Sequence, residues 1–328
     1  MRDGVSQEGS WTLEISEPAA FQSKDHDTMT TVGFIGLGSM GMPMARNLLA
    51  KGFSVQGFDV RAGSVRTLED AGGKGASSAA AAAAGADALV LMVVNAAQAD
   101  AALFADGALE ALPAGASVIL MATCPPGAAA ALAERVEAAG RRFVDAPVSG
   151  GVVGAVAGTL SIMAAADTAT VERVRPILAA MGDKVFHVGE KPGQGATVKT
   201  VNQLLCGVHI AVVAEAFALA AKVGVDLDIL LQIMSGSSAS SWMLKDRGPR
   251  MLEAEPEITS AVDIFVKDLG IVLEAGRDAK AALPLAAVAH QMFLATSGRG
   301  EGAMDDSQVI RSYHAVNGTA GGRPEGRQ

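Results

Sequence analysis

Two polar residues interrupt an otherwise apolar stretch in the second half of the chain. Lys199 and Asn202 are three residues apart near the start of a predicted helix over 195–223, so they share one face of it. A lysine in a buried helix loses hydration, which lowers its pKa toward neutrality. A neutral amine of this kind could take the proton of an alcohol as a general base, with Asn202 orienting it. A solvated lysine near a helix end has the same spacing and no such role, so both interpretations stay open.

A second group that could bind a ligand lies in the segment 145–151, DAPVSGG. Ser149 is followed by Gly150 and Gly151, which can bring consecutive backbone N–H groups to one point. Such an arrangement binds anions, and with a hydroxyl beside it would suit a substrate carboxylate. An ordinary Gly-Gly turn explains the same residues.

The elements that must position these residues begin with the stretch 32–59. A short apolar run leads into Gly36-Leu37-Gly38-Ser39-Met40-Gly41, and a helical pattern and a second apolar run follow. Gly36 permits a tight turn, Gly38 lets the backbone approach a pyrophosphate, and Gly41 lets the helix pack on its strand. The free N–H groups of the helix N-terminus would then face the phosphates. The pattern GxGxxG alone is common, but here a predicted strand precedes it and a predicted helix follows it, as a dinucleotide-binding turn requires.

Asp59 ends the second apolar run, 23 residues after Gly36, where a carboxylate on the adenosine ribose is expected. It would accept hydrogen bonds from the two ribose hydroxyls of NAD. Against the 2′-phosphate of NADP it would meet like charge, about 4 kcal/mol for a pair 4 Å apart at an effective dielectric of about 20. Arg61 could offset part of that repulsion. The pattern therefore favours NAD, with some use of NADP.

Apolar runs and helical stretches alternate from residue 30 to about 190. This alternation predicts an α/β fold, a Rossmann-type doubly wound parallel sheet, followed by an all-α domain. Ligands bind such sheets at the carboxyl ends of the strands, where Asn95 and Thr123 are also expected. The predicted strands are 32–35, 53–58, 88–94, 116–121, 142–146, 160–165 and 185–188.

The segment PGQG, 192–195, marks the change to long helices, predicted at 195–223, 226–235, 261–279, 284–297 and 306–314. In the third of these, Asp263 and Lys267 are four residues apart and could form a surface ion pair. We expect an extension over 1–29 that is disordered or precedes a natural start at Met29. The predicted domains are an NAD-binding domain at 30–192, a helical substrate and oligomerisation domain at 193–315, and a tail at 316–328.

Composition narrows the class of protein. The chain has 328 residues, 50% of them hydrophobic, and a net charge of −9, which argues against nucleic-acid or acidic-membrane partners. The cysteines, Cys124 and Cys206, form no CxxC, so we expect small buried residues in a reducing, cytoplasmic compartment. The histidines show no metal-ligand spacing, and no metal is expected.

The apolar segment 204–223 is long enough to cross a membrane, but His209, Glu215 and Lys222 interrupt it. Burial between subunits of a homodimer or homotetramer explains it better.

Four motifs together resemble the β-hydroxyacid dehydrogenase superfamily, which includes 3-hydroxyisobutyrate dehydrogenase and tartronate semialdehyde reductase. They are GFIGLGSMG at 33–41, DAPVSGG at 145–151, KTVNQ at 199–203 and KDL at 267–269. The resemblance covers residues 31–313. It implies an NAD-dependent enzyme with Lys199 as catalytic acid/base, Asn202 on the reacting hydroxyl and Ser149–Gly151 around the substrate carboxylate. It also implies that Thr123, Lys267 and Asn95 contact the cofactor near its nicotinamide end.

Further segments resemble the branch of this superfamily that oxidises C2 of L-threonate, a four-carbon sugar acid, to the 2-oxo acid. They include 204–210, 241–243, 260–269 and the region of Asp305. Many relatives have Asn-Asn after the lysine, and Gln203 here puts the contact from that position in doubt. Trp242 could line the substrate pocket or pack between helices. The alternatives are 3-hydroxyisobutyrate oxidation, reduction of tartronate semialdehyde, and a non-catalytic NAD-binding protein.

Overall fold

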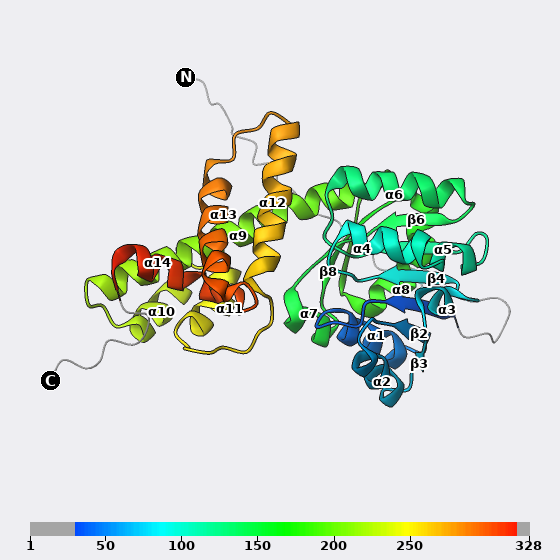
Figure 1. Ribbon diagram of the computed structural model, residues 1–328, viewed down its shortest axis with the longest axis horizontal. Helices are drawn as coiled ribbons and strands as arrows, with labels where there is room; N and C mark the ends of the chain where they lie inside the picture. The colour runs from blue at the N-terminus through cyan, green and yellow to red at the C-terminus, as the bar shows by residue number, and fades with distance from the viewer. Residues whose placement is uncertain (1–29, 320–328) are drawn as a thin grey trace, which may run out of the picture.

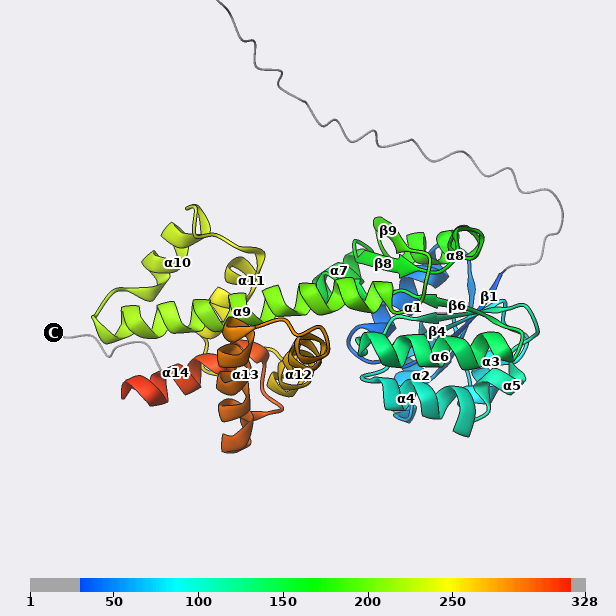
Figure 2. The same ribbon diagram turned by 90° about the horizontal axis from the view of Figure 1, so that it is seen from above.

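The structure is a computed structural model in which residues 30–319 are described (Figure 1). A sheet covered by helices forms one half of the molecule, a bundle of helices forms the other, and α9 (Gln194–Lys222) runs from the first into the second (Figure 2). Residues 1–29 and 320–328, which include the predicted extension and most of the predicted tail, lie outside the described residues.

Every predicted apolar run contains a strand. The strands are β1 (Thr31–Ile35), β2 (Ser54–Phe58), β3 (Lys74–Gly75), β4 (Ala88–Leu91), β5 (Ser117–Leu120), β6 (Arg142–Asp145), β7 (Val148–Ser149), β8 (Ser161–Ala165) and β9 (Lys184–Gly189). The two that the sequence did not predict, β3 and β7, have two residues each, too few to show a periodic pattern.

The strand order is β3-β2-β1-β4-β5-β6-β8-β7, with β9 beside β8. Pairing is parallel from β3 to β6, as predicted. The predicted doubly wound parallel sheet is confirmed, with one local departure, since β8 runs antiparallel to β6 and β7. β8 follows directly on β7 and α7, and this short connection reverses the chain where a full crossover helix would have kept its direction.

Helices cover both faces of this sheet. They are α1 (Gly41–Ala50), α2 (Ala62–Asp70), α3 (Ala79–Ala83), α4 (Ala96–Asp100), η1 (Ala101–Ala105), α5 (Ala108–Ala111), α6 (Pro126–Ala138), α7 (Gly151–Ala157) and α8 (Thr168–Met181). Side chains of a strand alternate between faces, so Val32 and Phe34 pack in one core with α1 and α8, and Ile35 packs in the other with α3 and α6. This two-sided core is the doubly wound arrangement.

The helical half surrounds α9 with α10 (Leu227–Ser235), α11 (Trp242–Met251), α12 (Val262–Asp278), α13 (Pro284–Thr296), η2 (Ser297–Glu301), η3 (Asp306–Val309) and α14 (Ile310–Asn317). Its core includes Phe217, Phe265 and Phe293, and the last two rings stack 5.2 Å apart. The sequence did not predict α11, and it ended the last helix at 314 where the structure continues to Asn317.

By length and composition α9 alone, among the helices of residues 30–319, could cross a membrane. Core helices pass the same test, and here α11, α12, α13 and α14 pack against it. Its first turn is in direct contact with the sheet. A Cβ on Gly195 would lie 2.5 Å from the Met163 carbonyl oxygen and 2.7 Å from that of Asp145, so only glycine lets α9 start there.

Candidate functional site

A cleft of 970 Å³ lies between the carboxyl ends of the strands and the helical half. Its lining brings together residues that are up to 230 positions apart in the chain. Among the predicted site residues it includes Gly38, Ser39, Met40, Gly41, Thr123, Ser149, Gly150, Gly151, Lys199, Asn202, Trp242 and Lys267. Gly36, Leu37, Asp59 and Asn95 are not part of the lining.

The glycine turn between β1 and α1 has the geometry that its sequence predicts. Gly36 has φ +95°, and a Cβ there would lie 2.3 Å from the Met92 carbonyl oxygen. A Cβ on Gly41 would lie 1.9 Å from the carbonyl oxygen of Gly36, so α1 and β1 approach each other as closely as backbones can. No side chain caps the N-terminus of α1, which leaves its positive end available to phosphate groups.

Asp59 supports this turn from β2. Its Oδ2 accepts a hydrogen bond from the Leu37 N–H at 2.8 Å, and its Oδ1 accepts from the Arg61 N–H at 2.8 Å and Arg61 Nε at 3.2 Å. Burial opposes ionisation, but the hydrogen bonds from Arg61 and Leu37 outweigh it and lower the pKa of Asp59. Arg61 lies over the turn, 3.4 Å from where a Gly38 Cβ would be. An ionised carboxylate and this open glycine turn fit the adenosine ribose and the pyrophosphate of a dinucleotide.

Asn95 caps a helix. Its Oδ1 accepts a hydrogen bond from the N–H of Gln98 at 2.9 Å, at the start of α4. Val93 and Val94, immediately before it, line the cleft. The contact of Asn95 with a cofactor stays a prediction.

Asp145 fixes the position of α9 and therefore of Lys199. Its Oδ2 accepts hydrogen bonds at 2.8 Å from the N–H groups of Gly193 and Ala196 at the helix N-terminus. Burial raises the pKa of Asp145 to about 6, although the N–H groups of Ala196, Gly193 and Gly195 oppose this. The carboxylate at the end of β6 thus joins the two halves of the molecule beside the cleft.

Lys199 lies in the second turn of α9 and is 8% exposed, which contradicts the alternative of a solvated lysine. Its side chain makes no hydrogen bond to another residue within 30–319. Burial lowers the pKa of Lys199; Asp268 and Cys206 oppose this shift and Lys267 adds to it. A buried amine without a fixed partner is suited to exchange a proton with a ligand.

Asn202 lies one turn after Lys199, and its Oδ1 accepts a hydrogen bond from Ser149 Oγ at 3.3 Å. Gly150 has φ +130° and Gly151 has φ +61°, conformations that favour glycine, at the start of α7. Trp242 lies opposite, with its ring edge 4.0 Å from where a Gly151 Cβ would be. It is 52% exposed, so it lines the cleft and is not packed between helices.

The sequence did not predict the role of Gln203. Its Oε1 accepts from Asn202 Nδ2 at 2.9 Å, and its Nε2 donates to Asp268 Oδ2. Lys267 Nζ donates to Asp268 Oδ1 at 2.6 Å and to the Thr123 carbonyl oxygen at 3.3 Å. We call the hydrogen-bonded residues Ser149, Asn202, Gln203, Asp268, Lys267 and Thr123 the cross-cleft series. The series starts and ends on the sheet and passes through α9 and α12.

Two expectations near this series are wrong. Lys267 does not pair with Asp263, because it turns toward Asp268, while Asp263 accepts from Ser297 Oγ at 2.6 Å. Cys124 is buried as expected, but Cys206 is half-buried, lines the cleft and accepts from Asn202 Nδ2 at 3.4 Å.

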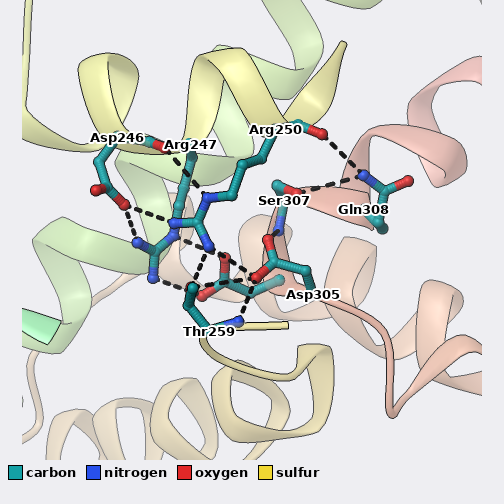
Figure 3. A network of polar contacts seen from close by, with 8 residues as sticks. Asp246, Arg247, Arg250, Thr259, Asp305, Ser307 and Gln308 are labelled. Carbon is teal, nitrogen blue, oxygen red and sulfur yellow. Dashed lines mark hydrogen bonds and ion pairs between the residues drawn. The ribbon is translucent and has the colours of Figure 1, made fainter. Parts of the chain in front are cut away.

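The far end of the cleft is formed by α11, which carries a network of ion pairs (Figure 3). Arg247 pairs with Asp306 and Asp246, and Arg250 pairs with Asp305 and Asp246. Burial would lower the pKa of Arg247, but the carboxylates of Asp306 and Asp246 outweigh it and raise that pKa. Two signals could have found this helix. Ser241 caps it by accepting from the Leu244 N–H at 3.0 Å, and Asp246 and Arg250 are four residues apart.

Comparison with known proteins agrees with this geometry. Residues 31–189 match the family described as the NAD-binding domain of 6-phosphogluconate dehydrogenase. Residues 193–313 match the family described as NAD-binding of NADP-dependent 3-hydroxyisobutyrate dehydrogenase. The second match falls on the helical half, which supplies Lys199, Asn202 and Lys267 to the cleft.

Individual relatives cover nearly the same residues. L-threonate dehydrogenase of Cupriavidus necator is 44% identical over 286 residues, 87% of this chain and 96% of the relative. 2-(Hydroxymethyl)glutarate dehydrogenase of Eubacterium barkeri is 35% identical over 291 residues, which are 88% of this chain and 96% of the relative. The crystal structure of 3-hydroxyisobutyrate dehydrogenase from Salmonella typhimurium superposes with a TM-score of 0.82 at 40% identity and covers 86% of this chain and 99% of that one.

The resemblance that the four motifs indicated is therefore confirmed along the whole described chain. The glycine turn belongs to an NAD-binding domain, and the relatives are dehydrogenases that act on CH–OH groups of small acids. The chain belongs to the 3-hydroxyisobutyrate dehydrogenase family and is an NAD-binding hydroxyacid dehydrogenase.

Proposed function

We propose that this enzyme oxidises C2 of L-threonate to the 2-oxo acid with NAD, and that Lys199 is its acid/base. The observation that carries the proposal is the position of a buried lysine in the cleft that also holds the glycine turn and the Ser149–Gly151 segment. The high identity to L-threonate dehydrogenase supports this substrate.

In this mechanism the residues of the chain bind, orient and move one proton. Ser149 and the N–H groups beside it hold the substrate carboxylate, which fixes one end of the molecule. Asn202 orients the C2 hydroxyl, and neutral Lys199 takes its proton. When bound, NAD supplies the hydride acceptor. The cross-cleft series holds Asn202 and Lys267 in place, and such positioning supplies a large share of the rate.

Replacement of the lysine tests the proposal. Lys199→Ala should lower kcat by about 10²–10⁴-fold, the usual range for general acid–base catalysis, while NAD binding measured by fluorescence titration stays unchanged. Lys222→Ala is the matched control, because Lys222 lies on the same helix, is exposed, and donates only to the Asn317 carbonyl oxygen at 2.7 Å. A Lys199→Ala enzyme that retains more than about a tenth of wild-type turnover would refute this role.

A panel of acids separates the substrate from its alternatives. We expect kcat/KM to be highest for L-threonate, lower for 3-hydroxyisobutyrate, and low for reduction of tartronate semialdehyde. A higher value for either alternative would replace L-threonate as the substrate and leave the role of Lys199 intact. NAD should be preferred over NADP, because the ionised Asp59 would repel a 2′-phosphate.

We also propose that a second copy of the chain covers apolar side chains that α9, α10 and α13 expose, in a homodimer or homotetramer. Leu219 is 62% exposed, Ile229 57% and Leu285 69%. Exposed apolar side chains that gather on one surface mark protein–protein interfaces. The mass of the protein in solution tests this. Two free cysteines are consistent with the cytoplasm as its compartment.

A further inference from the structure

We propose that Asp246 binds the hydroxylated end of the substrate, so that the cleft selects polyhydroxylated acids with one carboxylate over alkyl acids and dicarboxylic acids. The inference rests on the proposed function, because it assumes that the substrate carboxylate lies at Ser149–Gly151. It adds a residue of α11 as the determinant of specificity for the other end of the substrate.

The two oxygens of the Asp246 carboxylate differ in their contacts. Oδ2 accepts from Arg250 at 2.6 Å and also from Arg247. Oδ1 has no donor among residues 30–319, although the side chain lines the cleft and is 21% exposed. Figure 3 shows that the oxygen without a dashed line points away from both guanidinium groups. One acceptor of this carboxylate is therefore left for a ligand.

The rest of the network holds this acceptor in place before any substrate binds. Arg247 makes two parallel hydrogen bonds to Asp306, at 2.8 and 2.9 Å, and Arg250 contacts Asp305 at 2.8 Å. The Asp305 and Asp306 side chains are fully buried, which fixes α11 against η3 (Figure 3). A carboxylate held by two guanidinium groups loses little further freedom when it binds a hydroxyl.

The substrate carboxylate site and Asp246 line the same cleft. Asp246 lies four residues after Trp242, one turn further along the same face of α11. The Trp242 ring lies beside Gly151, where the substrate carboxylate is proposed to bind. Gly151, Trp242 and Asp246 all line the cleft, so the proposal places the carboxylate at Gly151 and a hydroxyl of the other end at Asp246.

Charge at this end of the cleft determines which groups are accepted. Three carboxylates face two guanidinium groups in the network, which leaves one net negative charge. A hydroxyl can donate to Oδ1, and hydrogen bonds to charged groups change equilibrium constants by about ten- to a hundredfold. A methyl group would leave Oδ1 without a donor, and a second carboxylate would meet like charge.

The test compares Asp246→Asn with Asp305→Asn by steady-state kinetics on three acids, L-threonate, 3-hydroxyisobutyrate and 2-(hydroxymethyl)glutarate. Asp246→Asn should raise KM for L-threonate about tenfold, leave kcat within about threefold, and lower KM for the dicarboxylic acid. KM values that change in opposite directions for the two acids identify a specificity residue, since a general structural defect would raise KM for both acids. Values for 3-hydroxyisobutyrate should stay within about threefold.

Asp305→Asn is the matched control because it weakens the same network from a residue outside the cleft lining. It should lower stability and leave the ratio of kcat/KM values for the three acids unchanged. Equal changes of that ratio in both variants, or no change in Asp246→Asn, would overturn the inference. Should Asp246→Asn not fold, Asp246→Glu keeps the charge and should reject the dicarboxylic acid as the wild type does; acceptance would contradict the inference.

The same experiment separates this inference from the proposed function. A wild-type enzyme that oxidises none of the three acids overturns both. An active wild-type enzyme with unaltered selectivity in Asp246→Asn overturns only the role of Asp246.

Discussion

The two sides of the cleft are built from different parts of the polypeptide. The sheet side is mostly backbone, because a Cβ on Gly36 or Gly41 would clash with a carbonyl oxygen of the neighbouring segment. The helical side consists mostly of side chains. Lys199 and Gln203 come from α9, and Asp268 comes from α12, 65 residues after Gln203. The sheet side therefore depends on close approach between neighbouring segments, and the helical side depends on long-range contacts.

This difference explains which function each side can carry. The pyrophosphate is the same in every dinucleotide, and N–H groups at a helix N-terminus bind it without any particular side chain. The relatives carry the names of different substrates, and the helical side supplies side chains of α9, α11 and α12 to the cleft lining. Substitutions on the sheet side and on the helical side should therefore impair the enzyme in different ways.

The largest effect is expected for Gly41→Ala on the sheet side. The new Cβ would lie 1.9 Å from the Gly36 carbonyl oxygen, so α1 must move away from β1. We expect a loss of about 3 kcal/mol or more in the free energy of unfolding and a roughly hundredfold weaker NAD affinity. Gly270→Ala is the control, since a Cβ there meets nothing within 4 Å in the interior of α12. Wild-type NAD affinity in Gly41→Ala would show that the turn tolerates a side chain.

The contact between the two sides should show in the pH dependence of stability. Burial raises the pKa of Asp145 from its ordinary value of 3.8 to about 6, so the folded protein binds this proton more tightly than the unfolded chain. The associated stability is fully present below about pH 3.8 and is lost as the pH rises through about 6. At about 1.4 kcal/mol per pH unit the full shift is worth about 3 kcal/mol, of which wild type should lose about 2.4 kcal/mol relative to Asp145→Asn between pH 4 and 7.

Urea unfolding of both proteins across this range measures that difference. Asp167→Asn is the control. Hydrogen bonds from Thr170 lower the pKa of Asp167 from its ordinary value of 3.8, so the stability it contributes is nearly constant between pH 4 and 7 and is lost only as the pH falls below that range. A difference between wild type and Asp145→Asn that does not vary with pH would show that the proton is not bound more tightly in the folded state.

The sheet side was largely predictable from the sequence because it is built from segments that are neighbours in the chain. The glycine turn, its strand and its helix are contiguous, so spacing alone describes Gly36, Gly41 and Asp59. The reversal at β8 was not predicted, because a two-residue strand such as β7 has no periodicity, and strand direction depends on the connection and not on composition.

The helical side was only partly predictable. Lys199 and Asn202 stand out as polar residues in an apolar helix, but Ser149 and Asp268, which complete the series around them, lie on other elements. Helix α11 was missed because four of its ten residues are charged and Pro249 interrupts the pattern, and its arginines pair with carboxylates at the start of η3, nearly 60 residues later. No local pattern indicates such pairs. Gln203 differs from the asparagine of many relatives, which puts its contact with a ligand in doubt from sequence alone. In the structure it forms the bridge between Asn202 and Asp268.

The smallest of these effects, and the sharpest test of the helical side, is expected for Gln203→Met. The Asp268 carboxyl accepts hydrogen bonds from Gln203 and Lys267, so it fixes the direction of the Gln203 amide, which in turn fixes that of Asn202 toward Ser149. Methionine keeps the length of the side chain and removes both contacts. We expect kcat to fall about tenfold with NAD affinity unchanged, because one hydrogen bond to a charged group is lost.

Two further variants distinguish positioning from stability. Gln203→Asn is too short to bridge both partners, and adding Asp268→Glu restores the missing length, so the double variant should recover part of the lost kcat. Gln56→Met is the control, because Gln56 is also buried and hydrogen-bonded, but in the sheet at the Ala84 carbonyl oxygen, 3.0 Å away and outside the cleft lining. It should lose stability and keep kcat. Wild-type kcat in Gln203→Met would mean that Asn202 keeps its orientation without the cross-cleft series, and that the helical side is held by packing alone.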